Sequence, residues 1–166
     1  PVRTTRAVSY VGVLQQALRD LSDWVENGRV PPASTDYEVM DGQIVVPDAA
    51  KARKSIQAVV TVTANGGSRA EVAVGQDVEF HATVEVPQGT GTIVTAEWDF
   101  EGAGDFPHPT EGLDGSAAQL RLSTTYAFSE PGTYFPALRV ASHRQGAVDS
   151  PFARVLNLGR VRVVVA

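Results

Sequence analysis

The chain has 166 residues, 43% of them hydrophobic and none of them cysteine, so it can build one domain with a sizeable core but neither a disulfide framework nor a thiolate metal site. This length excludes a complete α/β-hydrolase, Rossmann enzyme or α/β barrel with its connecting helices. A net charge of −5 disfavours nucleic acid as a partner, and no apolar run approaches the ~18 residues that a membrane span requires.

Residues 6–27 are predicted to form one amphipathic helix. Its apolar residues recur at alternating steps of three and four, at Val11, Leu14, Leu18, Leu21 and Val25. Thr4 or Thr5 is expected to cap its start, and Asn27-Gly28 to end it in a left-handed turn. Because burying each large apolar side chain is worth roughly 1.5–3 kcal/mol, we expect this face to pack on the rest of the chain or, in a homo-oligomer, on a second copy.

A short hairpin is predicted at residues 36–47, because Asp41-Gly42 favours a type I′ turn between two apolar runs. An isolated hairpin is marginal in water, so we expect it to dock on another element. Residues 48–55 are polar and are interpreted as a linker. The chain then divides into a helix-and-hairpin segment at 1–47, this linker, and a third segment at 56–166.

From Ile56 onward the hydrophobic pattern changes to a period of two, which predicts about seven short strands and a mainly β fold. The expected strands are 58–64, 72–86 with an interruption at Gly75, 92–100, 119–128, 133–142 and 157–165. A loop rich in Gly and Pro spans 101–117. Short strands separated by turn signals are typical of an antiparallel sandwich.

Three motifs in this region carry a resemblance to a known family. Residues 98–104 (WDFEGAG) resemble the W-D-F-x-G-D-G motif of the PKD domain, an immunoglobulin-like β-sandwich. Residues 74–80 (VGQDVEF) resemble the V-G-x-x-V-x-F start of that family's second strand, and residues 125–140 resemble its T-Y…P-G-x-Y-x-V-x-L-x-V stretch. Ala103 replaces the second acid of the first motif, and Pro136 lies inside the last, where it predicts a bulge or an edge strand.

The resemblance covers about residues 56–166 and implies an immunoglobulin-like antiparallel β-sandwich. It also implies a non-catalytic module of a larger exported bacterial protein, located outside the cell or on its surface. Such a module serves as a spacer or binds a protein or carbohydrate. No cofactor is predicted, apart from the calcium hypothesis described below.

A second resemblance concerns the first segment and supports an alternative function. Residues 18–34 (LRDLSDWVENGRVPPAS) are similar to the C-terminal helix and tail of certain bacterial α/β-hydrolase-like proteins. The resemblance implies that residues 1–47 are the C-terminal remnant of an esterase-class enzyme whose catalytic core lies upstream. The sequence begins at Pro1 rather than Met, so we expect a fragment. The family's nucleophile, acid and histidine have no matching positions in this chain.

No catalytic residue is predicted for the chain itself. A nucleophilic triad needs a base within reach of the nucleophile, and the sequence has no G-x-S-x-G elbow. The three histidines, His81, His108 and His143, are interpreted as surface residues because they fall on the polar face of a strand, in a loop and at a strand end. Their spacing does not match a zinc site.

Two roles remain open for the acidic residues that follow Trp98. Asp99, Glu101 and Asp105, with Asp114, are candidate oxygen ligands for Ca²⁺, which takes six to eight of them. Alternatively, the loop is solvated and Asp99 turns back to accept hydrogen bonds from backbone N–H groups. The loss of the second motif acid weakens the calcium hypothesis.

The aromatic residues fall mostly at core spacing, which favours packing over a sugar-binding platform. The best candidates for exposed contacts with a partner are Phe106, Phe128 and Phe135.

Overall fold

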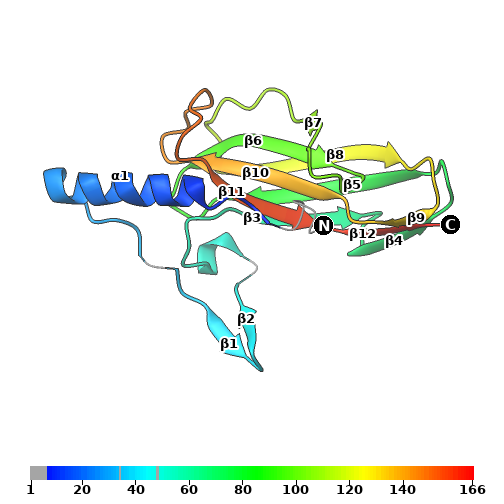
Figure 1. Cartoon of the computed structure of the whole chain (residues 1–166), viewed down its shortest axis with the longest axis horizontal. Helices are drawn as coiled ribbons and strands as arrows, with labels where there is room; N and C mark the ends of the chain where they lie inside the picture. The colour runs from blue at the N-terminus through cyan, green and yellow to red at the C-terminus, as the bar shows by residue number, and fades with distance from the viewer. Residues whose placement is uncertain (1–6, 34, 48) are drawn as a thin grey trace.

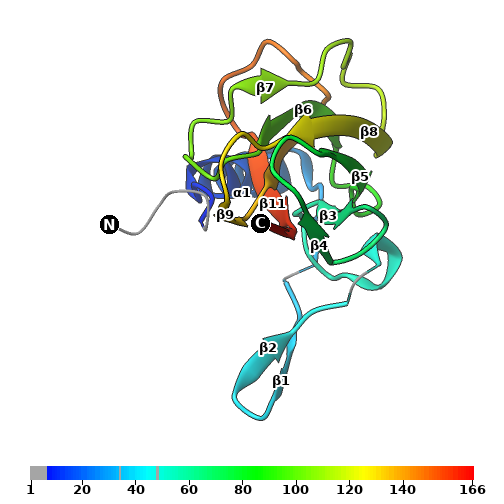
Figure 2. The ribbon, with the colours of Figure 1, turned by 90° about the vertical axis from the view of Figure 1, so that its right-hand side faces the viewer.

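The computed structural model describes residues 7–33, 35–47 and 49–166, which form one helix, a short hairpin and a β-sandwich (Figure 1). The helix runs out from one end of the sandwich (Figure 1). The hairpin lies below the two sheets and apart from them, as Figure 1 and Figure 2 both show. The cap predicted at Thr4 or Thr5 lies outside the described residues.

The helix, α1, spans Val11–Asn27, so the predicted start at residue 6 is wrong while the predicted end is confirmed. The hydroxyl of Ser9 accepts a hydrogen bond from the N–H of Val11, one of the donors that the first turn of a helix leaves without an intrahelical partner. At the other end Gly28 adopts the left-handed conformation (φ 69°), and its N–H bonds the carbonyl of Trp24.

The predicted hairpin is confirmed, but its docking is not. Strands β1 (Glu38–Met40) and β2 (Gln43–Val45) pair antiparallel around Asp41 and Gly42, whose φ values of 50° and 75° are those of a type I′ turn. All side chains of both strands are exposed, so the expectation that the hairpin packs on another described element is wrong. A single turn of 3₁₀ helix, η2 (Ala50–Ala52), lies in the predicted linker.

The first sheet of the sandwich has the order β3-β5-β8 and is antiparallel throughout. Its strands are β3 (Val59–Ala64), β5 (Asp77–Glu85) and β8 (Gln119–Ala127). In β5 the apolar side chains at alternate positions are buried and their neighbours are exposed or half-buried. The alternating pattern at 72–86 therefore corresponds to a strand with one face toward the core and the other toward solvent.

The second sheet faces the first and has the order β11-β10-β6-β7. Its strands are β6 (Thr92–Asp99), β7 (His108–Pro109), β10 (Ala137–His143) and β11 (Val155–Arg160). The pairing of β10 with β6 shifts register between Ala141 and Ser142, a β-bulge near one end of the sandwich. These two sheets confirm the mainly β, immunoglobulin-like sandwich.

Two of the predicted strands are each broken in two, one at Pro136 and the other at Val161. The stretch 133–142 becomes β9 (Gly132–Tyr134) and β10, and 157–165 becomes β11 and β12 (Arg162–Val165). Proline has no N–H to donate, but its carbonyl accepts the N–H of Val161 across the break. Beyond it β12 pairs with β9 and, in parallel, with β4 (Arg69–Val72), so the chain continues as a third short sheet.

The core between the sheets is built around a series of aromatic rings, each in contact with the next. Successive ring centroids lie 4.3–5.8 Å apart along the series Phe80, Trp98, Phe100, Tyr126, Phe128 and Tyr134. Trp98 is buried, as expected for a ring between two layers. The valines of β5, β10 and β12 complete this core.

Candidate functional site

The carboxylate of Asp99 accepts hydrogen bonds from the backbone of the loop that follows it. Asp99 is 1% exposed; one of its oxygens accepts the N–H groups of Gly102 (2.8 Å) and Ala103 (3.1 Å), and the other accepts that of Gly104 (2.6 Å). Gly102 and Gly104 have positive φ, which lets the chain wrap around the carboxylate. Of the two roles open for Asp99, the structure shows the backbone-binding one.

The structure does not assemble the predicted calcium ligands around a common point. Glu101 lies on the surface and accepts a hydrogen bond from the Tyr126 hydroxyl (2.9 Å), while Asp105 is exposed. Asp114 accepts hydrogen bonds from both the N–H and the hydroxyl of Ser116, which lower the pKa of its carboxyl. Among residues 7–33, 35–47 and 49–166, no group of three or more His, Asp or Glu side chains is placed to hold a metal ion.

Two of the three aromatic residues predicted to contact partners are buried. Phe128 is 2% exposed, between the rings of Tyr126 and Tyr134. Phe106 is 6% exposed and is covered by the guanidinium of Arg139, 4.2 Å from its ring centroid. The expected exposure of these two residues is therefore wrong: neighbouring core rings enclose Phe128, and the long loop folds Phe106 under Arg139. Phe135 is 44% exposed and remains a candidate.

Sequence reasoning missed Phe152, which is exposed in the loop before β11. Together with Val11, it borders a groove of about 410 Å³ between α1 and the second sheet. The ion pair of Arg139 and Glu97 (2.9 Å) also lines this groove. No strand or helix periodicity applies to a loop residue, so no pattern marked Phe152.

The three histidines lie in different environments, and one of them contradicts its prediction. His81 is exposed beside Glu79 (3.1 Å), and His108 is exposed next to the ring of Phe100. His143, predicted at the surface, is only 2% exposed. No histidine is hydrogen-bonded to a hydroxyl group of a described residue, so the arrangement of a Ser-His pair is not seen in this part of the chain.

His143 holds the turn that follows β10. Its Nδ1 accepts the N–H groups of Gln145 and Ala147, both at 3.2 Å, so this nitrogen carries no proton. Burial lowers the pKa of His143 below its usual 6.5, and the positive charges of Arg19 and Arg154 lower it further. The imidazole is therefore neutral and structural.

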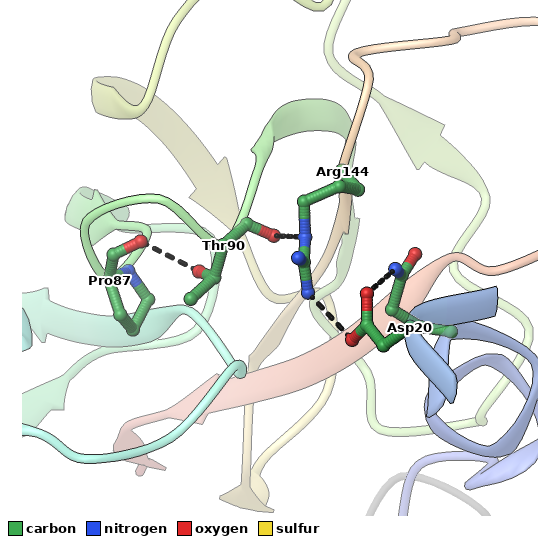
Figure 3. A network of polar contacts seen from close by, with 5 residues as sticks. Asp20, Pro87, Thr90 and Arg144 are labelled. Carbon is green, nitrogen blue, oxygen red and sulfur yellow. Dashed lines mark hydrogen bonds and ion pairs between the residues drawn. The ribbon is translucent and has the colours of Figure 1, made fainter. Parts of the chain in front are cut away.

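Arg144, the next residue, fastens α1 to the sandwich (Figure 3). Its guanidinium donates to the backbone carbonyl of Thr90 (3.2 Å) and to the carboxylate of Asp20 on α1 (3.1 Å). The other oxygen of Asp20 accepts the side-chain amide of Gln16 (2.9 Å). Both members of the ion pair are mostly buried, which strengthens their attraction relative to a surface pair.

The remaining contacts of α1 also involve its polar side. Gln15 accepts the N–H of Ala153 at 2.7 Å, and Gln16 is 2% exposed. Gly12 lies against the backbone of Arg154, where an added Cβ would come within 1.7 Å of the carbonyl oxygen. Only glycine permits this approach.

Apart from Val11, which borders the groove, the apolar face of α1 consequently points away from the sandwich. Its side chains are 49–76% exposed: Tyr10, Val11, Leu14, Leu18, Leu21, Trp24 and Val25. The prediction that this face packs on the described part of the chain is wrong. Helical periodicity identifies the apolar stripe but does not say which face the neighbouring sheet covers, and here glycine and two glutamines made the closer fit. In the residues that the structure describes, no helix has the length and apolar character needed to cross a bilayer.

Solved structures similar to this chain include β-sandwich domains of two archaea. The PKD domain of an M14-like peptidase from Thermoplasmatales archaeon SCGC AB-540-F20 is 13% identical, with a TM-score of 0.45, and the match covers 64% of this chain and 91% of that one. A CARDB domain from Pyrococcus furiosus, crystallised in complex with di-metal ions, is 16% identical, with a TM-score of 0.44 and coverage of 67% and 96%. No curated protein matches the sequence.

The sequence profile of the PKD domain matches residues 59–152, more than half of the chain. The match includes the W-D-F motif and its buried Trp98 and Asp99, and it runs from β3 to the loop before β11. The chain belongs to the PKD domain family.

Proposed function

We propose that this chain is a non-catalytic module of a larger exported bacterial protein, acting at the cell surface or outside the cell as a spacer and as an interaction domain for a protein or carbohydrate. The observation that carries the proposal is that polar groups are bound to the chain's own backbone while large apolar side chains are exposed. The groups suited to chemistry, Asp99 and His143, are bound to the chain's own backbone, whereas large apolar side chains on α1 and in two loops are exposed.

Rigidity supports a spacer role. The loop after β6 is held by three N–H bonds to one carboxylate, and the aromatic rings form an uninterrupted packed series between the sheets. A sandwich fixed in this way keeps its two ends at a constant separation and presents its loops without a conformational change.

The alternative is that α1 completes the core of an upstream esterase-class hydrolase. The exposed apolar face of α1 favours it, because a hydrolase core would cover that face. Under this alternative the sandwich orients the enzyme, and the chemistry belongs wholly to the upstream domain.

The first test measures hydrolysis of p-nitrophenyl esters by the 166-residue chain. We expect no rate above that of buffer, because no described histidine activates a hydroxyl nucleophile. Turnover by the purified chain, lost on heat denaturation, would overturn the non-catalytic assignment.

The second test concerns binding to carbohydrate. Retention on insoluble polysaccharides is compared for the wild type, Phe135→Ala and the similarly exposed control Val74→Ala. A carbohydrate-binding role through Phe135 predicts reduced retention of Phe135→Ala alone, and no retention of any of the three proteins would count against carbohydrate as the partner.

We also propose that no calcium is required. Excess Ca²⁺ or a chelator should then leave the melting temperature unchanged, whereas a rise with Ca²⁺ would show a folded-state site.

A further inference from the structure

The outward face of α1 has the spacing of a coiled-coil seam. Val11, Leu14, Leu18, Leu21 and Val25 follow one another at steps of three, four, three and four, which are the a and d positions of a heptad. The helix of 17 residues is about 25 Å long at a rise of about 1.5 Å per residue. The seam runs over its whole length.

The sandwich holds this seam outward. Gly12, Gln16 and Asp20 occupy b, f and c positions of the same heptads, on the opposite side of the helix. Gly12 and Asp20 contact Arg154 and Arg144 of the loop before β11, and Gln16 is buried on the same side. Rotating the seam inward would break the Asp20–Arg144 ion pair and expose the buried amide of Gln16. Specific contacts on the opposite side of α1 therefore keep the apolar face exposed to solvent.

The distribution of charge on α1 permits a second copy as the partner and favours an antiparallel orientation. The e and g positions that flank the seam hold Gln15, Ala17, Ser22 and Trp24, so no charge opposes a second copy. All charged residues of α1 lie in its second half, which carries three acids and one arginine, whereas the first half carries none. An antiparallel pair places each acidic half beside an uncharged half with its positive helix end.

The exposed area is sufficient for a stable dimer. Seven large side chains on this face are 49–76% exposed. At about 100 Å² each they present about 700 Å², which exceeds the ~300–600 Å² of the largest patch on a typical monomer. Two copies would bury about 1,400 Å², within the ~1,200–2,000 Å² of stable interfaces.

We propose that α1 pairs antiparallel with α1 of a second copy, forming a two-fold symmetric dimer whose sandwiches point to opposite ends. In the register that uses the whole helix and sets a against d, Leu18 meets Leu21 of the other copy and Leu14 meets Val25. Figure 1 shows that α1 extends beyond the sandwich, so no described element lies along the outer part of this seam.

Sedimentation equilibrium of the 166-residue chain across the micromolar range tests the dimer. The wild type should have twice the chain mass at the upper concentrations and dissociate on dilution. Leu18→Glu should move the dissociation midpoint to ~30-fold higher concentration or more, because it buries a charge at the centre of the seam. Ile44→Glu, at an equally exposed apolar side chain of the hairpin (65% against 67%), should leave the midpoint unchanged.

Cysteine cross-linking tests the orientation, since the chain has no cysteine of its own. Leu14→Cys and Val25→Cys chains, mixed under oxidising conditions, should form the mixed disulfide, while each alone should remain largely uncross-linked. Hydrogen exchange at the amides of β5 confirms that each variant keeps the folded sandwich.

Three results would overturn the proposal. A wild-type chain that is monomeric at every concentration would leave the face to an upstream domain of the same protein. Equal loss of association in Ile44→Glu would move the interface elsewhere. Efficient cross-linking of Val25→Cys to itself would show a parallel pair. None of these results bears on the absence of esterase activity. The association experiments therefore test the dimer independently of the non-catalytic function.

Discussion

Asp99 shows how one buried side chain organises a long irregular segment. Its two oxygens receive three backbone N–H groups, so the loop between β6 and β7 obtains from one carboxylate the hydrogen bonds that a strand partner would otherwise supply. The W-D-F motif thus has a structural explanation: the indole fills the core, and the acid next to it binds the loop.

Replacing Asp99 by Ala should cost about 3 kcal/mol or more of unfolding free energy, because it removes three hydrogen bonds to a charged acceptor and leaves partly buried N–H groups unpaired. Urea denaturation followed by tryptophan fluorescence measures the change. Asp105→Ala, at an exposed residue of the same loop, serves as the control and should cost less than about 0.5 kcal/mol. Equal effects of the two variants would contradict the role assigned to Asp99.

His143 makes the stability depend on pH. Burial lowers its pKa in the folded chain below the 6.5 of the unfolded chain, so the unfolded state binds more protons in the interval between those two values. Stability due to this residue is then fully present above about pH 6.5 and declines as the pH falls toward the folded-state pKa.

Unfolding by urea at pH 7.5 and pH 5.5 should therefore show a larger loss of stability for the wild type than for His143→Gln, which keeps an acceptor for the N–H groups of Gln145 and Ala147 but does not titrate. The other carboxylates and histidines titrate in both proteins and cancel in the comparison. A loss of equal size in both would show that His143 is not protonated on unfolding.

At the scale of elements, α1 is attached by its less apolar face. The hydrophobic effect alone would turn Leu14, Leu18 and Leu21 inward. Close approach of the helix to the 144–154 loop requires a residue without a Cβ at the contact, and Gly12 supplies it. The ion pair of Asp20 and Arg144 then closes the second half of the contact.

Gly12→Ala should detach α1 even though alanine is the better helix former by about 1 kcal/mol, because the new Cβ would overlap the Arg154 carbonyl. Hydrogen exchange reports the result: the amide of Ala153, bound to Gln15, should lose protection while the amides of β5 keep theirs. Ser22→Ala, on the exposed side of the helix, is the control and should change neither. A fully protected Ala153 in Gly12→Ala would refute this account of the docking.

At the scale of the whole molecule, the sandwich and the N-terminal segment differ in how they achieve burial. The sandwich encloses its own aromatic core between two sheets. The helix and hairpin instead present apolar side chains to solvent, on α1 and on β1 and β2. A domain with a self-sufficient core and an attached apolar helix is suited to connecting two bodies, which agrees with the proposed spacer and dimer.

The sequence by itself determined the elements whose causes are local. The period of two from β3 onward, the Asp41-Gly42 turn and the glycine stop after Asn27 depend on residues a few positions apart, and each was predicted correctly. Tertiary structure alone decided the outcomes that depend on distant partners. Gln15 and Ala153 are 138 positions apart, and the burial of Phe106 and His143 depends on loops that fold back over the sheet. No local pattern encodes such contacts, because they depend on whether two surfaces fit once both have folded.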